Sequence, residues 1–173
     1  SEITAVGQCA LFSNTTGADN VAVGFCALSC NTTAALNTAT GYLTLAANTT
    51  GAGNTASGYK ALLANTTGAN NVAMGYFALG TNTTGTCNVA IGYKALFDSN
   101  RGSGHEASYN VAVGSFAGHL NTTGHSNVSL GFEALTAVTT GVQNTGLGNN
   151  SGNSLTTGSN NTIIGNGAQA AAV

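Results

Sequence analysis

The sequence predicts an all-β protein, a parallel β-solenoid (β-roll) of ten 17-residue coils that occupies residues 1–173 as a single repeat domain. Three observations predict this fold: a glycine that returns at a fixed interval, an asparagine four residues before it, and small and large apolar residues that keep constant positions around it. One such repeat cannot bury its own apolar face, so the coils are expected to stack and to hydrogen-bond to their neighbours.

The repeated glycine sets the register of the chain. It returns every 17 residues except between Gly92 and Gly114, where the interval is 22 residues. This places a loop insertion, residues 98–109, between the sixth and seventh coils. The repeated glycines are Gly7, Gly24, Gly41, Gly58, Gly75, Gly92, Gly114, Gly131, Gly148 and Gly165.

Two columns before the glycine predict the interior. An asparagine stands four residues before nine of the ten glycines, and stacked side-chain amides can hydrogen-bond to one another along a ladder. Two residues before the glycine the side chain is small except at Ile163, which indicates a narrow interior. The ladder asparagines are Asn20, Asn37, Asn54, Asn71, Asn88, Asn110, Asn127, Asn144 and Asn161.

Two columns after the glycine carry large side chains. A leucine four residues after it supplies the filler that the small slot leaves room for, as at Leu28 and Leu45. Aromatic residues directly after the glycine are expected to stack as a second ladder. These aromatic residues are Phe25, Tyr42, Tyr59, Tyr76, Tyr93 and Phe132.

The coils are joined by Asn-Thr-Thr-Gly corners, as at Asn48 and Asn65. Asn and Thr side chains bond to nearby backbone and Gly tolerates positive φ, so this tetrapeptide predicts a turn. The segments between turns, such as residues 21–23, are of strand length and too short for stable helices.

Composition agrees with stacking and narrows the partners. Charged residues make up 5% of the chain and proline is absent, because like charges in one column would repel and proline would remove a ladder hydrogen bond. A net charge of -2 with three basic residues predicts no nucleic-acid partner. No apolar stretch approaches the roughly 20 residues that span a bilayer, so no membrane insertion is expected. The start at Ser1, without a leader, is typical of a mature product or an excised fragment.

The unit Asn-Val-Ala-Met-Gly-Tyr at residues 71–76 and its counterpart at residues 88–93, each followed by Ala-Leu and, after the first, an Asn-Thr-Thr-Gly corner, resemble two related repeat families. One is the head of trimeric autotransporter adhesins, a left-handed β-roll with a shorter repeat. The closer is the longer repeat of phage tail-fibre proteins. The resemblance covers nearly the whole chain.

The resemblance implies a left-handed winding, a homotrimer, and an extracellular, cell-surface or virion-fibre location. The function expected is a stiff structural or adhesive segment of a fibre, with attachment to a cell-surface glycan or receptor. Two alternatives stay open: a subunit of an end-to-end stacked extracellular filament, and an ice-binding solenoid that uses the threonine columns of its corners.

The insertion is the candidate binding loop. It gathers charged and aromatic residues on a segment that protrudes from a regular rod, where binding groups are usually presented. The alternative is a tolerated, solvated insertion. Asp98 and Glu106 lack the rigid cleft that glycosidase carboxylates need, so no catalytic residue and no enzyme activity are expected. The loop candidates are Asp98, Arg101, His105, Glu106 and Tyr109.

Cysteines and histidines give weaker predictions. Cys9 and Cys26 occupy one column one coil apart, within reach of a disulfide, and two free thiols are the alternative. His105, His119 and His125 are expected to be solvated turn residues, because no metal-binding spacing supports a site. The sequence therefore predicts no metal and no cofactor.

One further column is apolar but alternates with the small slot, so strand periodicity directs it outward. An apolar stripe along a rod must be covered, and parallel association of several rods would cover it. A bend that turns the column inward is the alternative. The column contains Val6, Val23, Met74, Ile91, Val113, Leu130, Leu147 and Ile164.

Overall fold

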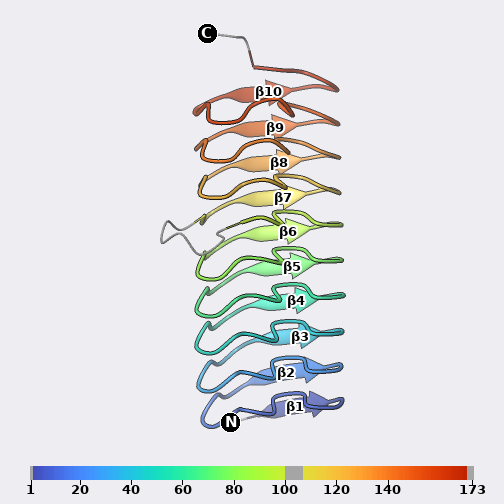
Figure 1. The fold of residues 1–173 in the computed structure, drawn as a ribbon, viewed down its shortest axis with the longest axis vertical. Helices are drawn as coiled ribbons and strands as arrows, with labels where there is room; N and C mark the ends of the chain where they lie inside the picture. Colours follow the sequence, from blue (N-terminus) through green and yellow to red (C-terminus); the bar gives the residue numbers. More distant parts are fainter. Residues whose placement is uncertain (1, 100–106, 171–173) are drawn as a thin grey trace.

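The computed structural model describes residues 2–99 and 107–170 and shows a rod of stacked coils, each of which contributes one short strand (Figure 1). The ten strands form one parallel sheet in sequence order, and the described residues contain no helix, as predicted. The strands are β1 (Ile3–Val6), β2 (Asn20–Val23), β3 (Thr38–Thr40), β4 (Thr55–Ser57), β5 (Val72–Met74), β6 (Val89–Ile91), β7 (Val111–Val113), β8 (Val128–Leu130), β9 (Thr145–Leu147) and β10 (Thr162–Ile164).

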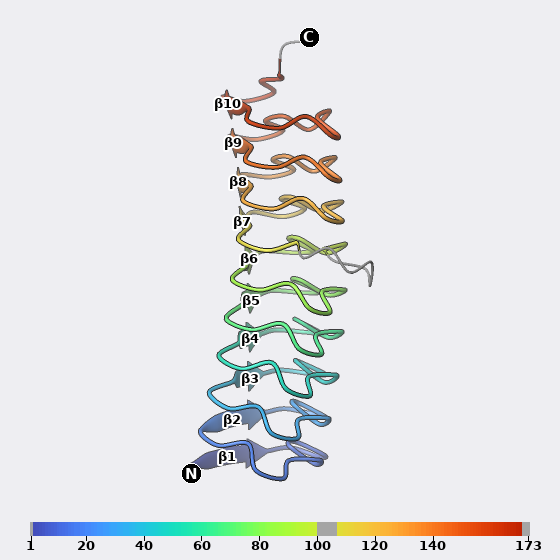
Figure 2. The same ribbon diagram turned by 90° about the vertical axis from the view of Figure 1, so that its left-hand side faces the viewer.

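Equivalent residues of successive coils lie directly opposite each other. Ala56 pairs with Ala73, and Ala90 pairs with Ala112 although the insertion separates them in sequence. The insertion therefore leaves the sheet register unchanged. In Figure 1 the strands run from left to right on the far side while the chain rises toward its C-terminus, and Figure 2 places the strands at one edge of the rod. The winding is left-handed.

The interior consists of the small slot and the leucine column. In the three-residue strands β3 to β10 the middle residue points inward, and Ala39, Ala56 and Ala73 are fully buried. The column leucines have φ between 47° and 51°, a conformation that costs an L-residue roughly 1–2 kcal/mol. Burying a leucine stabilises the fold by about 1.5–3 kcal/mol, which offsets this cost in each coil. These leucines are Leu11, Leu28, Leu45, Leu62, Leu79, Leu96 and Leu135.

The repeated glycine is required by close backbone contact. Gly75 has a φ of 131°, and a Cβ built on it would lie 2.6 Å from the carbonyl oxygen of Gly92 in the next coil. Side chains cannot be accommodated at that distance, and this backbone conformation is essentially restricted to glycine. The close approach of successive coils therefore requires glycine at this position in each coil that another coil follows, which is why glycine recurs with the period of the repeat.

Departures from the repeat compensate for one another. Gly152 replaces a column leucine, and a Cβ there would lie 2.7 Å from side-chain atoms of both Leu135 and Ile163. Ile163, the large residue in the small slot, thus occupies space that the missing leucine leaves. Gly146 in the same slot gives room to Leu135, whose Cγ would lie 2.7 Å from a Cβ at that position.

We expect Gly75→Ala to lower the free energy of unfolding by about 3 kcal/mol or more, because it adds both backbone strain and a clash with Gly92. Gly167→Ala is the matched control: Gly167 also has a positive φ, 65°, but nothing lies within 4 Å of its added Cβ. Its loss should be about 1 kcal/mol. Chemical denaturation followed by circular dichroism measures both, and equal losses would contradict the close-contact argument.

Candidate functional site

The predicted asparagine ladder is present and fully buried over most of its length. The side-chain Oδ1 of Asn54 accepts the backbone N–H of Asn71 at 3.0 Å, and its Nδ2 donates to the carbonyl of Gly68 at 2.8 Å. Amide-to-amide bonds also occur, from Asn71 to Asn54 at 3.1 Å. The ladder therefore works mainly by satisfying backbone groups of the next coil, a larger role than the predicted side-chain stacking.

A second asparagine ladder runs through the corners, where the sequence predicted a turn. Asn48 Nδ2 donates both to Gly51 within its own turn, at 2.9 Å, and to Asn31 Oδ1 one coil away, at 3.1 Å. Asn65 repeats this with Asn48 at 2.8 Å. The corner recurs with the same period as the first ladder, so this stacking was available as a sequence signal.

The second ladder is interrupted where the repeat departs from Asn. Ser99 and Val138 stand at the ladder position. The Oδ1 atoms of Asn82 and Asn121, one coil before each interruption, are buried without a hydrogen-bond partner. Neither Ser99 nor Val138 has a side-chain amide that could donate to the asparagine of the coil before it, so these two acceptors are left unpaired.

The candidate loop is described only at its ends. Asp98 is half-buried and its N–H donates to the carbonyl of His119 at 3.0 Å. Tyr109 is 63% exposed and its N–H donates to the carbonyl of Thr86 at 3.1 Å. Arg101, His105 and Glu106 lie outside the described residues, so the loop stays a prediction.

The aromatic ladder is confirmed from Phe25 to Tyr93. The rings of Tyr42, Tyr59, Tyr76 and Tyr93 are stacked with centroids 5.0–5.2 Å apart and interplanar angles of 5–10°. Ser115 ends the run, and the edge of Phe116 packs on Tyr93 at 5.2 Å instead. The tyrosines are each about two-fifths exposed, so the ladder forms an external edge of the rod.

A cationic and aromatic column lies beside this ladder. The Lys60 ammonium lies 5.1 Å from the Tyr59 ring centroid and 5.3 Å from that of Phe77. The Lys94 ammonium lies 5.6 Å from Tyr93 and 5.3 Å from Phe97.

The same region corrects one prediction about the histidines. His119 is half-buried and stacks on Phe97 at 5.6 Å, whereas we expected a solvated turn residue. The aromatic rings of neighbouring coils shield it from solvent. His125 is exposed as expected.

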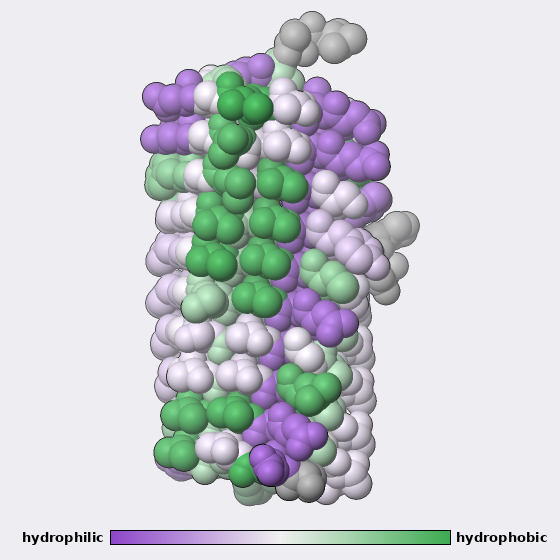
Figure 3. All heavy atoms as spheres, turned by 180° about the vertical axis from the view of Figure 1, so that it is seen from behind, coloured by the Kyte–Doolittle hydropathy of each residue, from purple (hydrophilic) through white to green (hydrophobic). Residues whose placement is uncertain are grey.

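The outer face of the sheet carries the apolar column that the alternation predicted. Figure 3 views the rod from this side and shows two adjacent hydrophobic columns over part of its length. Met74 and Ile91 are 45% and 37% exposed, so this column is not turned inward. On the earlier strands β3 and β4 the same face is polar. We name as the outer apolar stripe Val72, Met74, Val89, Ile91, Val111, Val113, Val128 and Leu130.

All four cysteines are free thiols, so the possible Cys9–Cys26 disulfide is not formed in this structure. The side chain of Cys26 lies close to that of Cys9. Partial burial, and then the neighbouring thiols of Cys9 and Cys30, raise the pKa of Cys26.

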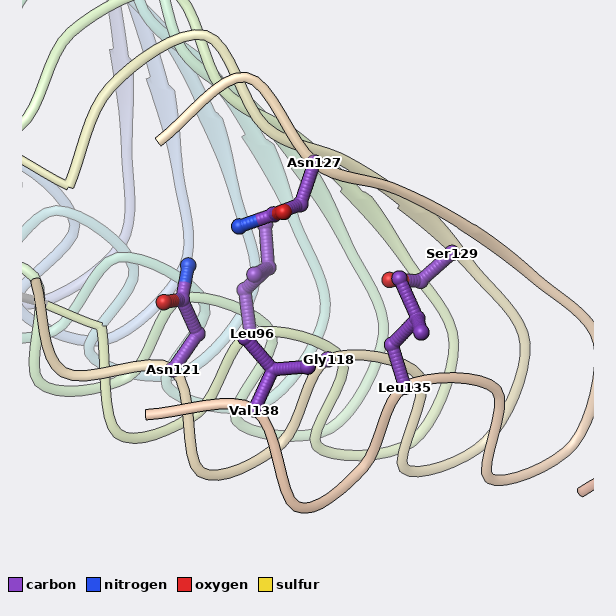
Figure 4. Close-up of a pocket in the computed structure, with 7 residues that line it drawn as sticks. All are labelled: Leu96, Gly118, Asn121, Asn127, Ser129, Leu135 and Val138. Carbon is purple, nitrogen blue, oxygen red and sulfur yellow. The ribbon is translucent and has the colours of Figure 1, made fainter. Parts of the chain in front are cut away.

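An interior gap follows from the loss of a leucine at Gly118. Figure 4 shows it between Leu96 and Leu135, with Ser129 and Val138 also lining it. The gap has no room for a water molecule. It is a packing defect and cannot hold a ligand.

Within residues 2–99 and 107–170, no group of His, Cys, Asp or Glu side chains is arranged to hold a metal ion. None of these residues forms a helix that could cross a membrane. No family model, curated protein or solved structure matches the chain. Two surfaces remain as candidates for function. One is the outer apolar stripe, and the other is the exposed row of Tyr42, Tyr59, Tyr76 and Tyr93, which we name the tyrosine edge.

We expect Asn54→Asp to destabilise the fold by about 3 kcal/mol at pH 7, because a buried carboxylate would face the Gly68 carbonyl. Burial raises the pKa of that carboxyl above its ordinary value of about 3.9. Folding then takes up a proton, so stability should recover as the pH falls through the raised pKa. Unfolding measured from pH 7 downward tests this. Asn70→Asp, at an exposed position, is the control and should show little loss; a loss at Asn54 that does not vary with pH would contradict the prediction.

Cys9→Ser should lower the pKa of Cys26, because it removes a neighbouring thiol that raises it. The pH midpoint of Cys26 alkylation by iodoacetamide, followed by peptide mass spectrometry, should therefore move down. An unchanged or higher midpoint would show that the Cys9 thiol does not act on Cys26.

Proposed function

We propose that the chain is a stiff structural and adhesive segment of an extracellular or virion fibre, in which copies of the rod associate side by side as a homotrimer. The observation that carries this proposal is the outer apolar stripe on an in-register stack of one repeated coil. The proposed role is mechanical and non-catalytic.

Stiffness is supported by hydrogen bonding in every coil. Each coil is bonded to the next through the sheet, and two buried asparagine ladders add bonds between most successive coils. To bend the rod, these bonds must lengthen on one side, and buried amides left unpaired cost about 1–3 kcal/mol each. Such a rod suits a spacer that holds attachment surfaces away from a particle or a cell.

Side-by-side association is supported by the stripe itself. Isolated exposed apolar residues are ordinary on proteins, but contiguous patches of this kind mark interaction surfaces. Charged residues are absent from the strands β5–β8 that carry the stripe. A second copy offers the same spacing of coils, so two stripes can pack in register along their length.

The ice-binding alternative has less support. It relies on free threonine hydroxyls at the corners, but Thr32, Thr49 and Thr66 donate their hydroxyls to carbonyls of the next coil at 3.0–3.1 Å. The hydroxyls of this threonine column already serve the fold, and the following column, as at Thr33, Thr50 and Thr67, is the exposed one.

Ile91→Asp should convert the assembly to monomers without unfolding the rod, because it places a charge in the exposed centre of the stripe. Thr55→Asp is the control, at an exposed position of the same sheet face on the polar strand β4. Light scattering gives the mass, and negative-stain electron microscopy shows the rods. A wild-type protein that is monomeric at high concentration would refute side-by-side association.

A further inference from the structure

We propose that the tyrosine edge, with Lys60 and Lys94, binds a linear acidic polysaccharide that lies along the rod and carries one carboxylate per disaccharide. This assignment rests on the adhesive role proposed above and names its ligand class and its surface. It arises from the spacing and bonding of one row of side chains.

The tyrosine hydroxyls are available for a ligand. Tyr42, Tyr59, Tyr76 and Tyr93 are stacked face to face, so their faces cover one another and their exposed edges carry the phenol groups. None of these hydroxyls has a hydrogen-bond partner among the described residues. Four unpaired donor and acceptor groups therefore stand in a row on a rigid support.

The spacing of the row selects an extended glycan. Ring centroids repeat every 5.0–5.2 Å, which is close to the length of one pyranose residue in an extended β-linked chain. One phenol hydroxyl can then meet each successive sugar. A compact ligand would use one or two tyrosines and gain nothing from the regular period.

The lysines add a second, longer period. Lys60 and Lys94 are two coils apart, about 10 Å from the strand spacing, with Phe77 in the intervening coil. Each ammonium lies beside the tyrosine of its own coil and has no carboxylate partner among the described residues. One cation for every two tyrosines matches one anion for every two sugars.

The charges of the chain limit the site to this segment. The net charge of -2 gives no long-range attraction for a polyanion, so binding must depend on these two local cations. Glu133 stands in the lysine column two coils beyond Lys94. A polyanion is repelled there, so the site ends before Glu133.

The test measures affinity for hyaluronan oligosaccharides, with chitin oligosaccharides as the neutral probe and heparin as a denser polyanion. The chain has no tryptophan, and four of its five tyrosines form the edge, so tyrosine fluorescence reports binding directly. We expect hyaluronan to bind, chitin oligosaccharides to bind more weakly, and added salt to weaken the hyaluronan complex.

Substitutions separate the site from general charge effects. Lys60→Gln should lower hyaluronan affinity about two- to fivefold, the effect of one exposed ion pair. Thr162→Glu lowers the net charge by the same amount at an exposed position of strand β10, and it should change the affinity little. Tyr76→Phe keeps the stacked ring and should still weaken binding. Glu133→Lys extends the column by one more period and should strengthen binding about two- to fivefold.

Three results would overturn the assignment: no hyaluronan binding by the wild type, equal losses for Lys60→Gln and Thr162→Glu, or preference for heparin with no effect of Tyr76→Phe. Light scattering and microscopy on the same samples separate this from the fibre proposal. Associated rods that fail to bind hyaluronan would disprove the glycan site alone, and monomeric protein that binds it would disprove the association alone.

Discussion

Equivalent residues of successive coils lie against one another in this rod, and this self-stacking limits which side chains a column can hold. Asparagine suits the interior because its amide both donates and accepts, so Asn48 can satisfy Asn65 as Asn31 satisfies Asn48. Tyrosine suits the exterior because its rings stack. Charged side chains suit neither, since each would meet its own charge in the next coil. Lys60 and Lys94 occur in one column only because Phe77 separates them.

Stacking at strand spacing also explains the unusual backbone. Each coil must close within 17 residues while it keeps its sheet hydrogen bonds to both neighbours, so it turns sharply at several positive-φ positions. Leucine is not favoured at such a φ, yet Leu62 and Leu79 hold it in successive coils. Burial of the leucine side chain outweighs the conformational cost of its positive φ, and the same holds for the column leucines of the neighbouring coils. Local propensity is overruled by packing here because the packing is repeated.

The sequence was sufficient to predict the fold, the register and the inward direction of the small strand residue, whereas it left open whether the neighbouring apolar column points outward. A fixed period requires stacking, and alternation then sends Ala56 inward and its neighbours Thr55 and Ser57 outward. The burial of Asn48 and Asn65 was not predicted, because Asn-Thr-Thr-Gly reads locally as a surface turn and its side chains point inward only when the coil is closed. The compensation between Leu135 and Gly146 was also missed, since the two residues belong to different columns and meet only across the interior.

The inward columns determine the fold, and this leaves the outward columns free to differ from coil to coil. The outer sheet face is polar on β3 and β4 and apolar on β5 to β8, although the buried alanines do not change. Met74 and Tyr76 flank the glycine that turns the chain at the edge of the sheet. If rods associate through the stripe, the tyrosine edge of each rod lies at the rim of that interface, where polar and wet contacts are ordinarily found. Association and glycan binding are then compatible on one rod, because they use two adjacent columns of side chains. The glycine column between them carries no side chain and belongs to neither surface.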